Sequence, residues 1–215
     1  MSSRAQQQAA QVLFDLGQHE KAMATLERAI DRIPNDMTLR MWKIIYSCRY
    51  TQMNSLDLLA LQKLSKNSIY DLRAFNLYQL FVDEAAQGKC NGLSLDEVKV
   101  VLHGLMALPA NANPKSGRFS QLQYLNGRLA VYQAEPDFAL KYFKSSLRAR
   151  SGPGKAMNMA AFLASKQYYL EAMILSDIAM SYVEDGNVGS TNRDRDTLGK
   201  DIAVFQEILR TQMQE

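Results

Sequence analysis

Few residues in this chain could carry out acid–base, nucleophilic or metal chemistry together. The 215-residue sequence contains 2 histidines and 2 cysteines, whereas a hydrolase or metalloenzyme needs several such side chains at one point. His19 falls in an expected turn and His103 on an amphipathic helix, so a packing or solvated role is favoured for both. The sequence has no glycine-rich phosphate loop and no nucleophile elbow. We therefore expect no catalytic residue, no cofactor and no metal site in this chain.

The two cysteines, Cys48 and Cys90, are too far apart in the sequence to suggest zinc binding. In an oxidising compartment an even number of cysteines permits one disulfide, which would clamp the middle of the chain. In the cytoplasm both side chains would remain thiols. The residues alone leave these two states open.

A group of basic residues marks one expected helix and the segment that follows it. Five cations lie within fifteen residues: Lys141, Lys144, Arg148, Arg150 and Lys155. The first three are candidate partner-binding residues, because their spacing of three and four places them on one side of the helix. The partner would be anionic, such as a phosphorylated glycan carrier or a lipid head group. The alternative is a solvated outer face.

An aromatic row, Trp42, Tyr46 and Tyr50, follows the spacing i, i+4, i+8 of one helix face. If this face lines the concave side of a helical array, the row is a candidate site for an extended peptide or a sugar. The alternative is that the row is buried between neighbouring helices.

The helices that carry these residues follow a recurring spacing. In residues 17–36 a glycine turn is followed by small, large and small residues and then a proline, at Gly17, Ala22, Leu26, Ala29 and Pro34. This skeleton resembles a tetratricopeptide repeat, in which small residues let two helices approach closely. Proline ends the second helix because it lacks the amide donor and disfavours helix at the residue before it.

The same spacing recurs twice downstream. The matching positions are Gly127, Ala139, Phe143 and Ser146 in one copy, and Ala160, Ala172 and Ala179 in the next. Ala139 and Ala172 are 33 residues apart, close to the period of about 34 that this repeat class has. Ser151 and Glu184 replace the closing proline, and Ser176 replaces the large residue.

The sequence therefore predicts an all-α fold, a right-handed superhelical solenoid of tetratricopeptide-like helical hairpins in one domain, 1–215. Clear repeats are expected at about 6–36, 118–152 and 154–184, with irregular helical pairs over 37–110. A C-terminal capping helix is expected at about 195–213, with Asp201, Gln206, Glu207 and Arg210 exposed. No alternation typical of strands is present in the sequence.

Charge and hydropathy limit the possible partners. The net charge of +3 is small and dispersed, so we expect no nucleic-acid partner. The longest apolar stretch, VKVVLHGLMALPA, is interrupted by Lys99 and His103 and falls short of the roughly 20 residues of a membrane span. The N-terminus lacks the apolar core of a secretory signal. These features predict either a cytoplasmic protein or a fragment of a larger one.

The order of the segments has a narrower resemblance. An early repeat ending in LERAIDRIPND precedes the stretch with Cys48 and Cys90, which is followed by YLNGRLAVYQAEPDFALKYFKSSLRAR and AAFLASKQYYLEAMILSDIAM. This order resembles the soluble C-terminal region of bacterial membrane glycosyltransferases of the O-antigen ligase or polymerase and O-linked oligosaccharyltransferase kinds. The resemblance implies a location on the periplasmic side of the inner membrane, a credible disulfide, and a basic face near anionic lipid. It carries no catalytic residue to this chain.

We therefore expect a noncatalytic interaction domain whose concave groove binds a protein or peptide. The favoured setting is the soluble part of a membrane glycosyltransferase. The alternative is a free-standing cytoplasmic adaptor that binds peptide segments, and a third possibility is self-association through the aromatic row.

Overall fold

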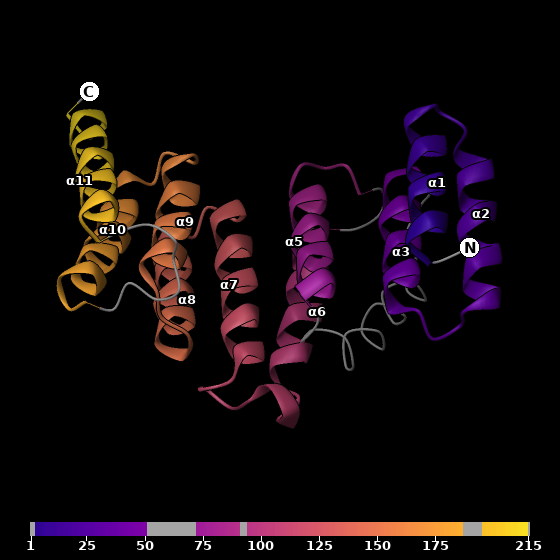
Figure 1. The fold of residues 1–215 in the computed structure, drawn as a ribbon, viewed down its shortest axis with the longest axis horizontal. Coiled ribbons are helices and arrows are strands. Elements are labelled where there is room, and N and C mark those ends of the chain that lie inside the picture. The colour runs from indigo at the N-terminus through magenta and orange to yellow at the C-terminus, as the bar shows by residue number, and fades with distance from the viewer. Residues whose placement is uncertain (1–2, 51–71, 91–93, 187–194, 215) are drawn as a thin grey trace. The chain divides into compact units, whose positions relative to one another are not determined.

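A computed structural model describes residues 3–50, 72–90, 94–186 and 195–214, and all the regular secondary structure in these ranges is helical (Figure 1). The prediction of an all-α fold built from tetratricopeptide-like helices is confirmed. The chain divides into two compact units, residues 1–109 (unit 1) and 110–215 (unit 2). That the chain acts as one continuous domain stays a prediction.

Unit 1 begins with a helical hairpin of α1 (Ser3–Asp15) and α2 (His19–Arg32). Gly17 joins the two helices with φ of +72°, a conformation that favours glycine because it has no Cβ. The three predicted packing residues of α2, Ala22, Leu26 and Ala29, are all buried. The hairpin is thus held by the residues whose spacing predicted it.

The rest of unit 1 contains α3 (Met37–Tyr50), α5 (Leu72–Ala86) and α6 (Leu95–Met106). Asp36 caps α3 by accepting hydrogen bonds from the backbone amides of Thr38 and Leu39 at 2.9 and 3.1 Å. Ser94 and Glu97 form a capping box at the start of α6. Part of the predicted irregular region, residues 51–71, lies outside the described residues.

Two contacts tie α3 to the end of α5 and the turn after it. Cys48 and Cys90 are both buried, with Cα atoms 4.4 Å apart and sulfur atoms in contact. Beside them the guanidinium of Arg49 donates two hydrogen bonds to the carboxylate of Glu84, one of them from Nε at 2.9 Å. Glu84 is buried, so this ion pair lies within the packed part of unit 1.

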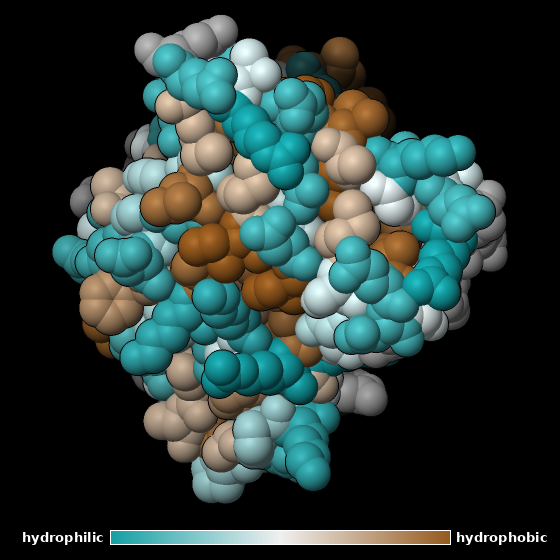
Figure 2. Space-filling model, turned by 90° about the vertical axis from the view of Figure 1, so that its left-hand side faces the viewer, coloured by the Kyte–Doolittle hydropathy of each residue, from teal (hydrophilic) through white to brown (hydrophobic). Residues whose placement is uncertain are grey.

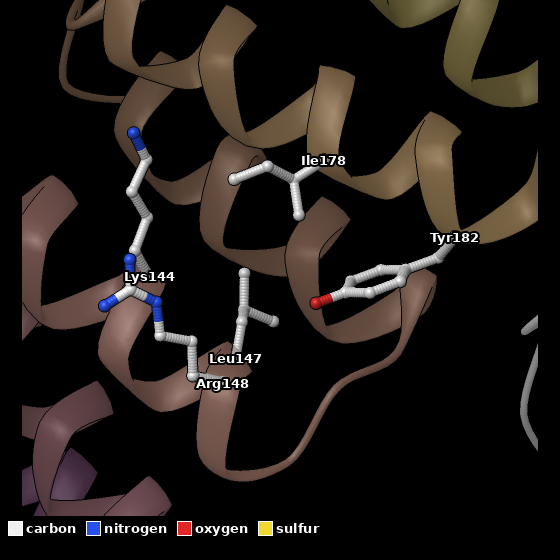
Figure 3. Close-up of a pocket in the computed structure, with 5 residues that line it drawn as sticks. All are labelled: Lys144, Leu147, Arg148, Ile178 and Tyr182. Atoms are coloured by element: carbon white, nitrogen blue, oxygen red, sulfur yellow. The ribbon is translucent and has the colours of Figure 1, made fainter. Parts of the chain in front are cut away.

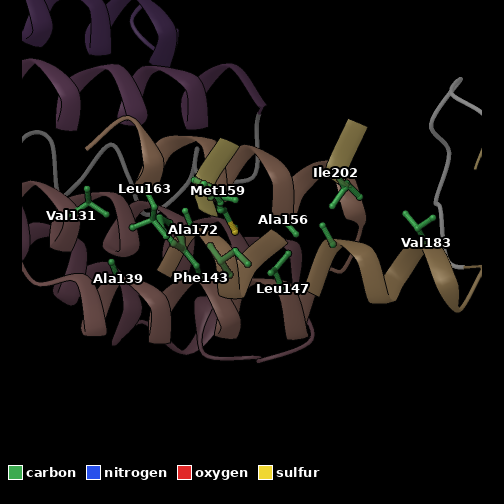
Figure 4. Packing of buried hydrophobic residues seen from close by; sticks show 14 of the residues in the cluster. Val131, Ala139, Phe143, Leu147, Ala156, Met159, Leu163, Ala172, Val183 and Ile202 are labelled. Carbon is green, nitrogen blue, oxygen red and sulfur yellow. The ribbon is translucent and has the colours of Figure 1, made fainter. Parts of the chain in front are cut away.

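Unit 2 contains two further hairpins and a last helix. The first hairpin is α7 (Gly117–Tyr132) with α8 (Pro136–Ala149), and the second is α9 (Pro153–Ala164) with α10 (Tyr169–Glu184). A 3-10 turn, η1 (Pro109–Asn111), precedes α7, and α11 (Arg195–Gln212) packs against α10. One hydrophobic cluster runs through all five α-helices of this unit (Figure 4).

Small residues allow the helices of each hairpin in unit 2 to approach closely. Ala139, Ala160, Ala172 and Ala179 are all fully buried. Gly127 on α7 faces the ring of Phe143 on α8, and a Cβ atom at this position would lie 2.4 Å from Phe143 Cε1. In the first hairpin of unit 2 the predicted small and large positions, Gly127 and Phe143, therefore meet as the repeat spacing requires.

A polar link joins α7, α8 and the first turn of α9. Ser120 Oγ donates to the backbone oxygen of Ser146 at 2.8 Å, and Ser146 Oγ donates to that of Ser120 at 2.6 Å. Lys155 Nζ donates to Ser120 Oγ at 2.5 Å. Lys155 therefore points inward and does not join the predicted basic surface.

The outer part of unit 2 differs from the predicted polar cap. Gln206 on α11, expected to be exposed, is buried and donates to Ser176 Oγ at 3.2 Å and to Asp177 Oδ1 at 2.9 Å. The small Ser176 leaves space for this amide where the repeat pattern expects a large residue. Val204 and Ile208 on α11 are more than half exposed. Figure 2 looks onto the α11 end of unit 2 and shows apolar residues gathered in the middle of this side.

Candidate functional site

A pocket of about 270 Å³ lies between α8 and α10 of unit 2. Five side chains line it: Lys144, Leu147, Arg148, Ile178 and Tyr182 (Figure 3). The first three project from α8 and the last two from α10. In Figure 3 the two aliphatic side chains lie between the cations on one side and the tyrosine ring on the other.

The helical repeat explains why these five residues meet. On α8 the lining residues are three and four apart, and on α10 they are four apart, so each helix presents one face. Ile178 follows Lys144 by 34 residues, and Tyr182 follows Arg148 by 34 residues. This offset is one residue more than the 33 that separate the equivalent positions Ala139 and Ala172, so turns about one repeat apart lie beside each other on α8 and α10.

The polar groups at the rim are donors without partners. Among the residues that the structure describes, the side chains of Lys144, Arg148 and Tyr182 form no ion pair or hydrogen bond. Burial raises the pKa of the Tyr182 phenol, so the hydroxyl is protonated at neutral pH and can donate. The pocket thus presents two cations and a hydroxyl to any group that enters it.

The floor of the pocket is apolar and rigid. Leu147 is 2% exposed and belongs to the core cluster of unit 2, so packing within this core fixes its position. Ile178 packs against the same cluster. The arrangement suits binding of an anionic group that is attached to an apolar one. The lining offers no nucleophile paired with a base, so it does not point to catalysis.

Two of the predicted basic residues, Lys144 and Arg148, are brought together in this pocket. Lys141 lies one turn earlier on α8, exposed and outside the lining. Leu147, Ile178 and Tyr182 were not predicted as site residues. The 34-residue offset between α8 and α10 is the signal in the sequence that could have identified the two residues of α10.

Two residues of the predicted aromatic row take part in the core cluster of unit 1: Tyr46 belongs to it and Trp42 packs against it. Tyr46 is fully buried, and its ring stacks on Phe14 with ring centroids 3.6 Å apart. Its hydroxyl contacts Gln11, and burial raises the pKa of this hydroxyl.

The other two residues of the row differ in exposure. Tyr50 is 40% exposed, and its ring stacks on that of His19 with centroids 3.8 Å apart. Trp42 packs against Tyr46 at 5.2 Å. The two alternatives for this row were ligand binding and burial between helices, and Tyr46 is buried.

The part of the chain that the structure describes contains neither a cluster of metal ligands nor a membrane-spanning helix. No group of three or more His, Cys, Asp and Glu side chains in these ranges could hold a metal ion. None of the helices described is both long and apolar enough to cross a membrane.

Comparison with known proteins identifies one repeat. No curated protein and no solved structure matches the chain. Residues 3–45, which include α1, α2 and most of α3, match the family model described as a tetratricopeptide repeat. Stacked repeats of this kind build extended surfaces for binding partners. The N-terminal hairpin of this chain is therefore similar to a tetratricopeptide repeat, the class that the residue spacing predicted.

Proposed function

We propose that this chain is a noncatalytic protein-interaction domain that acts as a scaffold or recruits a partner protein. The observation that carries the proposal is the match of residues 3–45 to a tetratricopeptide repeat. Helical hairpins of the same design in unit 2 support it. Such arrays bind extended partners over several hairpins, because each repeat adds surface without a separate core.

The partner surface has two candidate positions. The predicted one is the concave groove, which the first helices of the hairpins line in this repeat class, and it stays a prediction. The second is the pocket between α8 and α10, which are the second helices of their hairpins. The unpartnered cations at this pocket favour the second position.

Site-specific photocrosslinking in the native cells tests the proposal. A photoreactive residue is placed at one exposed position on each helix of unit 2 after α7: Lys141, Asn158, Leu170 and Glu207. We expect at least one position to give a discrete adduct with one other protein, identified by mass spectrometry. If every position yields only the free chain, the proposed function is wrong.

The finer proposal is that the chain is the soluble part of a bacterial membrane glycosyltransferase that acts on surface glycans or O-glycosylated proteins. The placement of Cys48 beside Cys90 supports an oxidising compartment such as the periplasm. An immunoblot of fractionated native cells tests this proposal. A membrane-bound band well above 24.3 kDa is expected, whereas a soluble band at that mass would favour a free-standing cytoplasmic adaptor.

A further inference from the structure

We propose that the pocket between α8 and α10 binds an acidic segment of a partner protein, with a carboxylate between Lys144 and Arg148 and a neighbouring aliphatic side chain on Leu147 and Ile178. This inference rests on the proposed function, because it names the class of partner that the interaction domain accepts. It adds a site and a ligand chemistry that the repeat architecture alone does not specify.

The positive charge of the pocket determines that the ligand must carry a negative charge. Lys144 is half-buried and Arg148 is exposed, and neither is neutralised by an acidic side chain within the described part of the chain. Two other basic side chains do have acidic partners: Lys43 pairs with Glu27 at 2.9 Å and Arg210 with Glu207 at 3.1 Å. An incoming carboxylate can therefore accept charge-assisted hydrogen bonds from both cations.

The apolar floor of the pocket requires that an apolar group be attached to the anionic group of the ligand. Leu147 and Ile178 point toward each other in the middle of the pocket (Figure 3). A free anion would occupy the rim and leave these side chains uncovered. A peptide with an acidic residue beside a leucine, isoleucine, methionine or phenylalanine fills both parts at once, because it brings the carboxylate and the apolar group on one short segment.

The volume of the pocket, about 270 Å³, lies just below the range of roughly 300–1,000 Å³ that is usual for cofactors and small-molecule ligands. It suits one or two side chains of a longer ligand. The hydroxyl of Tyr182 points from the α10 side into the same space (Figure 3) and supplies a donor to a second oxygen of the carboxylate or to a peptide carbonyl.

A protein segment fits these observations better than a lipid surface. Binding to anionic membranes relies on clusters of about 4–8 basic residues near one plane, whereas this pocket has two cations around an apolar floor. Lys155 does not extend the basic group, because its amine points inward to Ser120. The membrane alternative is therefore left as an outcome of the test.

Selection from a displayed library of random peptides tests the inference on the full chain. The bait proteins are the original chain, the double variant Lys144→Glu with Arg148→Glu, and the matched control Lys141→Glu. The control reverses one charge on the same helix, at a residue outside the pocket lining. Circular dichroism and thermal unfolding confirm that all three baits are folded.

We expect the original chain and the control to enrich peptides in which Asp or Glu adjoins an aliphatic or aromatic residue. For such a peptide, made with a fluorescent label, the double variant should weaken binding by at least about tenfold, since each charge-assisted hydrogen bond contributes strongly to binding. Ile178→Thr, which adds no charge beside Lys144 and Arg148, should weaken the preference for the apolar neighbour. Tyr182→Phe should weaken binding about threefold while the fold is unchanged.

Three results would overturn the inference. One is equal enrichment on all three baits, and another is the absence of an acidic motif. The third is binding to vesicles of phosphatidylglycerol, or to inorganic phosphate, that depends on Lys144 and Arg148 while no peptide is enriched. None of these results contradicts the proposed function. The photocrosslinking experiment tests that function separately, at positions on α9, α10 and α11 as well as on α8.

Discussion

Gly127 on α7 and Phe143 on α8 fit together so closely that the aromatic ring occupies the space of any side chain at position 127. A Cβ atom there would lie 2.4 and 2.5 Å from two carbons of the Phe143 ring. Phe143 is fully buried, and rings packed on both sides cannot move aside without cost. At this point the two helices of the hairpin approach each other as closely as the Phe143 ring allows.

Gly127→Ala is therefore expected to destabilise the chain by about 2–3 kcal/mol through overpacking, although alanine is normally the better helix former. Gly104→Ala on α6 is the control, because that position is exposed and opens onto free space. The control should be stabilised by about 0.5–1 kcal/mol. Urea unfolding measures both changes. Equal stability of Gly127→Ala and the original chain would contradict the packing described for this hairpin.

A double-mutant cycle separates this contact from a general effect on the helix. Phe143→Leu removes the ring and costs stability on its own, but it also makes room for a methyl group at position 127. The two changes together should therefore cost at least about 1 kcal/mol less than the sum of the single changes. Additive costs would show that the clash lies elsewhere.

Lys155 gives the stability of the chain a specific dependence on pH. Burial, with the nearby charge of Arg150, lowers the pKa of Lys155 from 10.5 to about 8. Between these two values the unfolded chain binds more protons than the folded chain, so stability increases as the pH rises. Relative to Lys155→Met, the original chain should gain about 2 kcal/mol between about pH 7 and about pH 10.

Urea unfolding of both proteins at several pH values measures this difference, in which the titration of all other groups cancels. The matched control is Lys141→Met, which changes an exposed lysine of α8. Its difference from the original chain should stay constant over the same pH range. A constant difference for Lys155→Met as well would show that its amine is solvated and not held at Ser120.

The ion pair between Arg49 and Glu84 is expected to matter far more than the one between Lys43 and Glu27. Arg49→Met leaves the buried carboxylate of Glu84 without its cation and should cost about 3 kcal/mol. The Lys43 and Glu27 side chains are 39% and 51% exposed, so Lys43→Met should cost less than about 0.5 kcal/mol. Thermal or urea unfolding of the two variants gives the comparison, and similar costs would contradict the burial of Glu84.

The native protein is expected to contain a disulfide between Cys48 and Cys90. The two residues are 42 apart in the sequence, and closing a loop of this length in the unfolded chain corresponds to about 4 kcal/mol in the chain-entropy model. Alkylation of the protein from rapidly acidified native cells measures the redox state, and unfolding with and without dithiothreitol measures the effect on stability. The control is the variant with both cysteines changed to alanine, which should not respond to dithiothreitol. Two alkylated thiols in the native protein would favour a cytoplasmic location.

The elements of this fold could be predicted where a local pattern determines them. Gly17 marks the first turn, Ser94 with Glu97 marks the start of α6, and the small residues mark the hairpins, because each pattern acts within one or two turns of helix. The sequence predicts that the second helix ends at Pro34, and α2 ends close to this residue, at Arg32.

The features that could not be predicted depend on contacts between residues about one repeat apart. Gln206 looks like a surface residue by type, and it is buried because Ser176, 30 residues earlier, is small enough to receive it. Lys155 looks like part of a basic surface, and it turns inward because Ser120 and Ser146 accept its hydrogen bonds. Arg148 and Tyr182 line one pocket because they lie about one repeat period apart, so the repeat offset predicts neighbours that helix periodicity alone misses.

The most direct test of the central claim, that this chain acts by binding another protein, is isothermal titration of the purified chain with the protein captured by photocrosslinking. We predict saturable binding with a dissociation constant of about 10 µM or tighter. The double variant Lys144→Glu with Arg148→Glu should weaken it at least about tenfold, and Lys141→Glu should leave it unchanged. The absence of saturable binding between the two purified proteins would contradict the account.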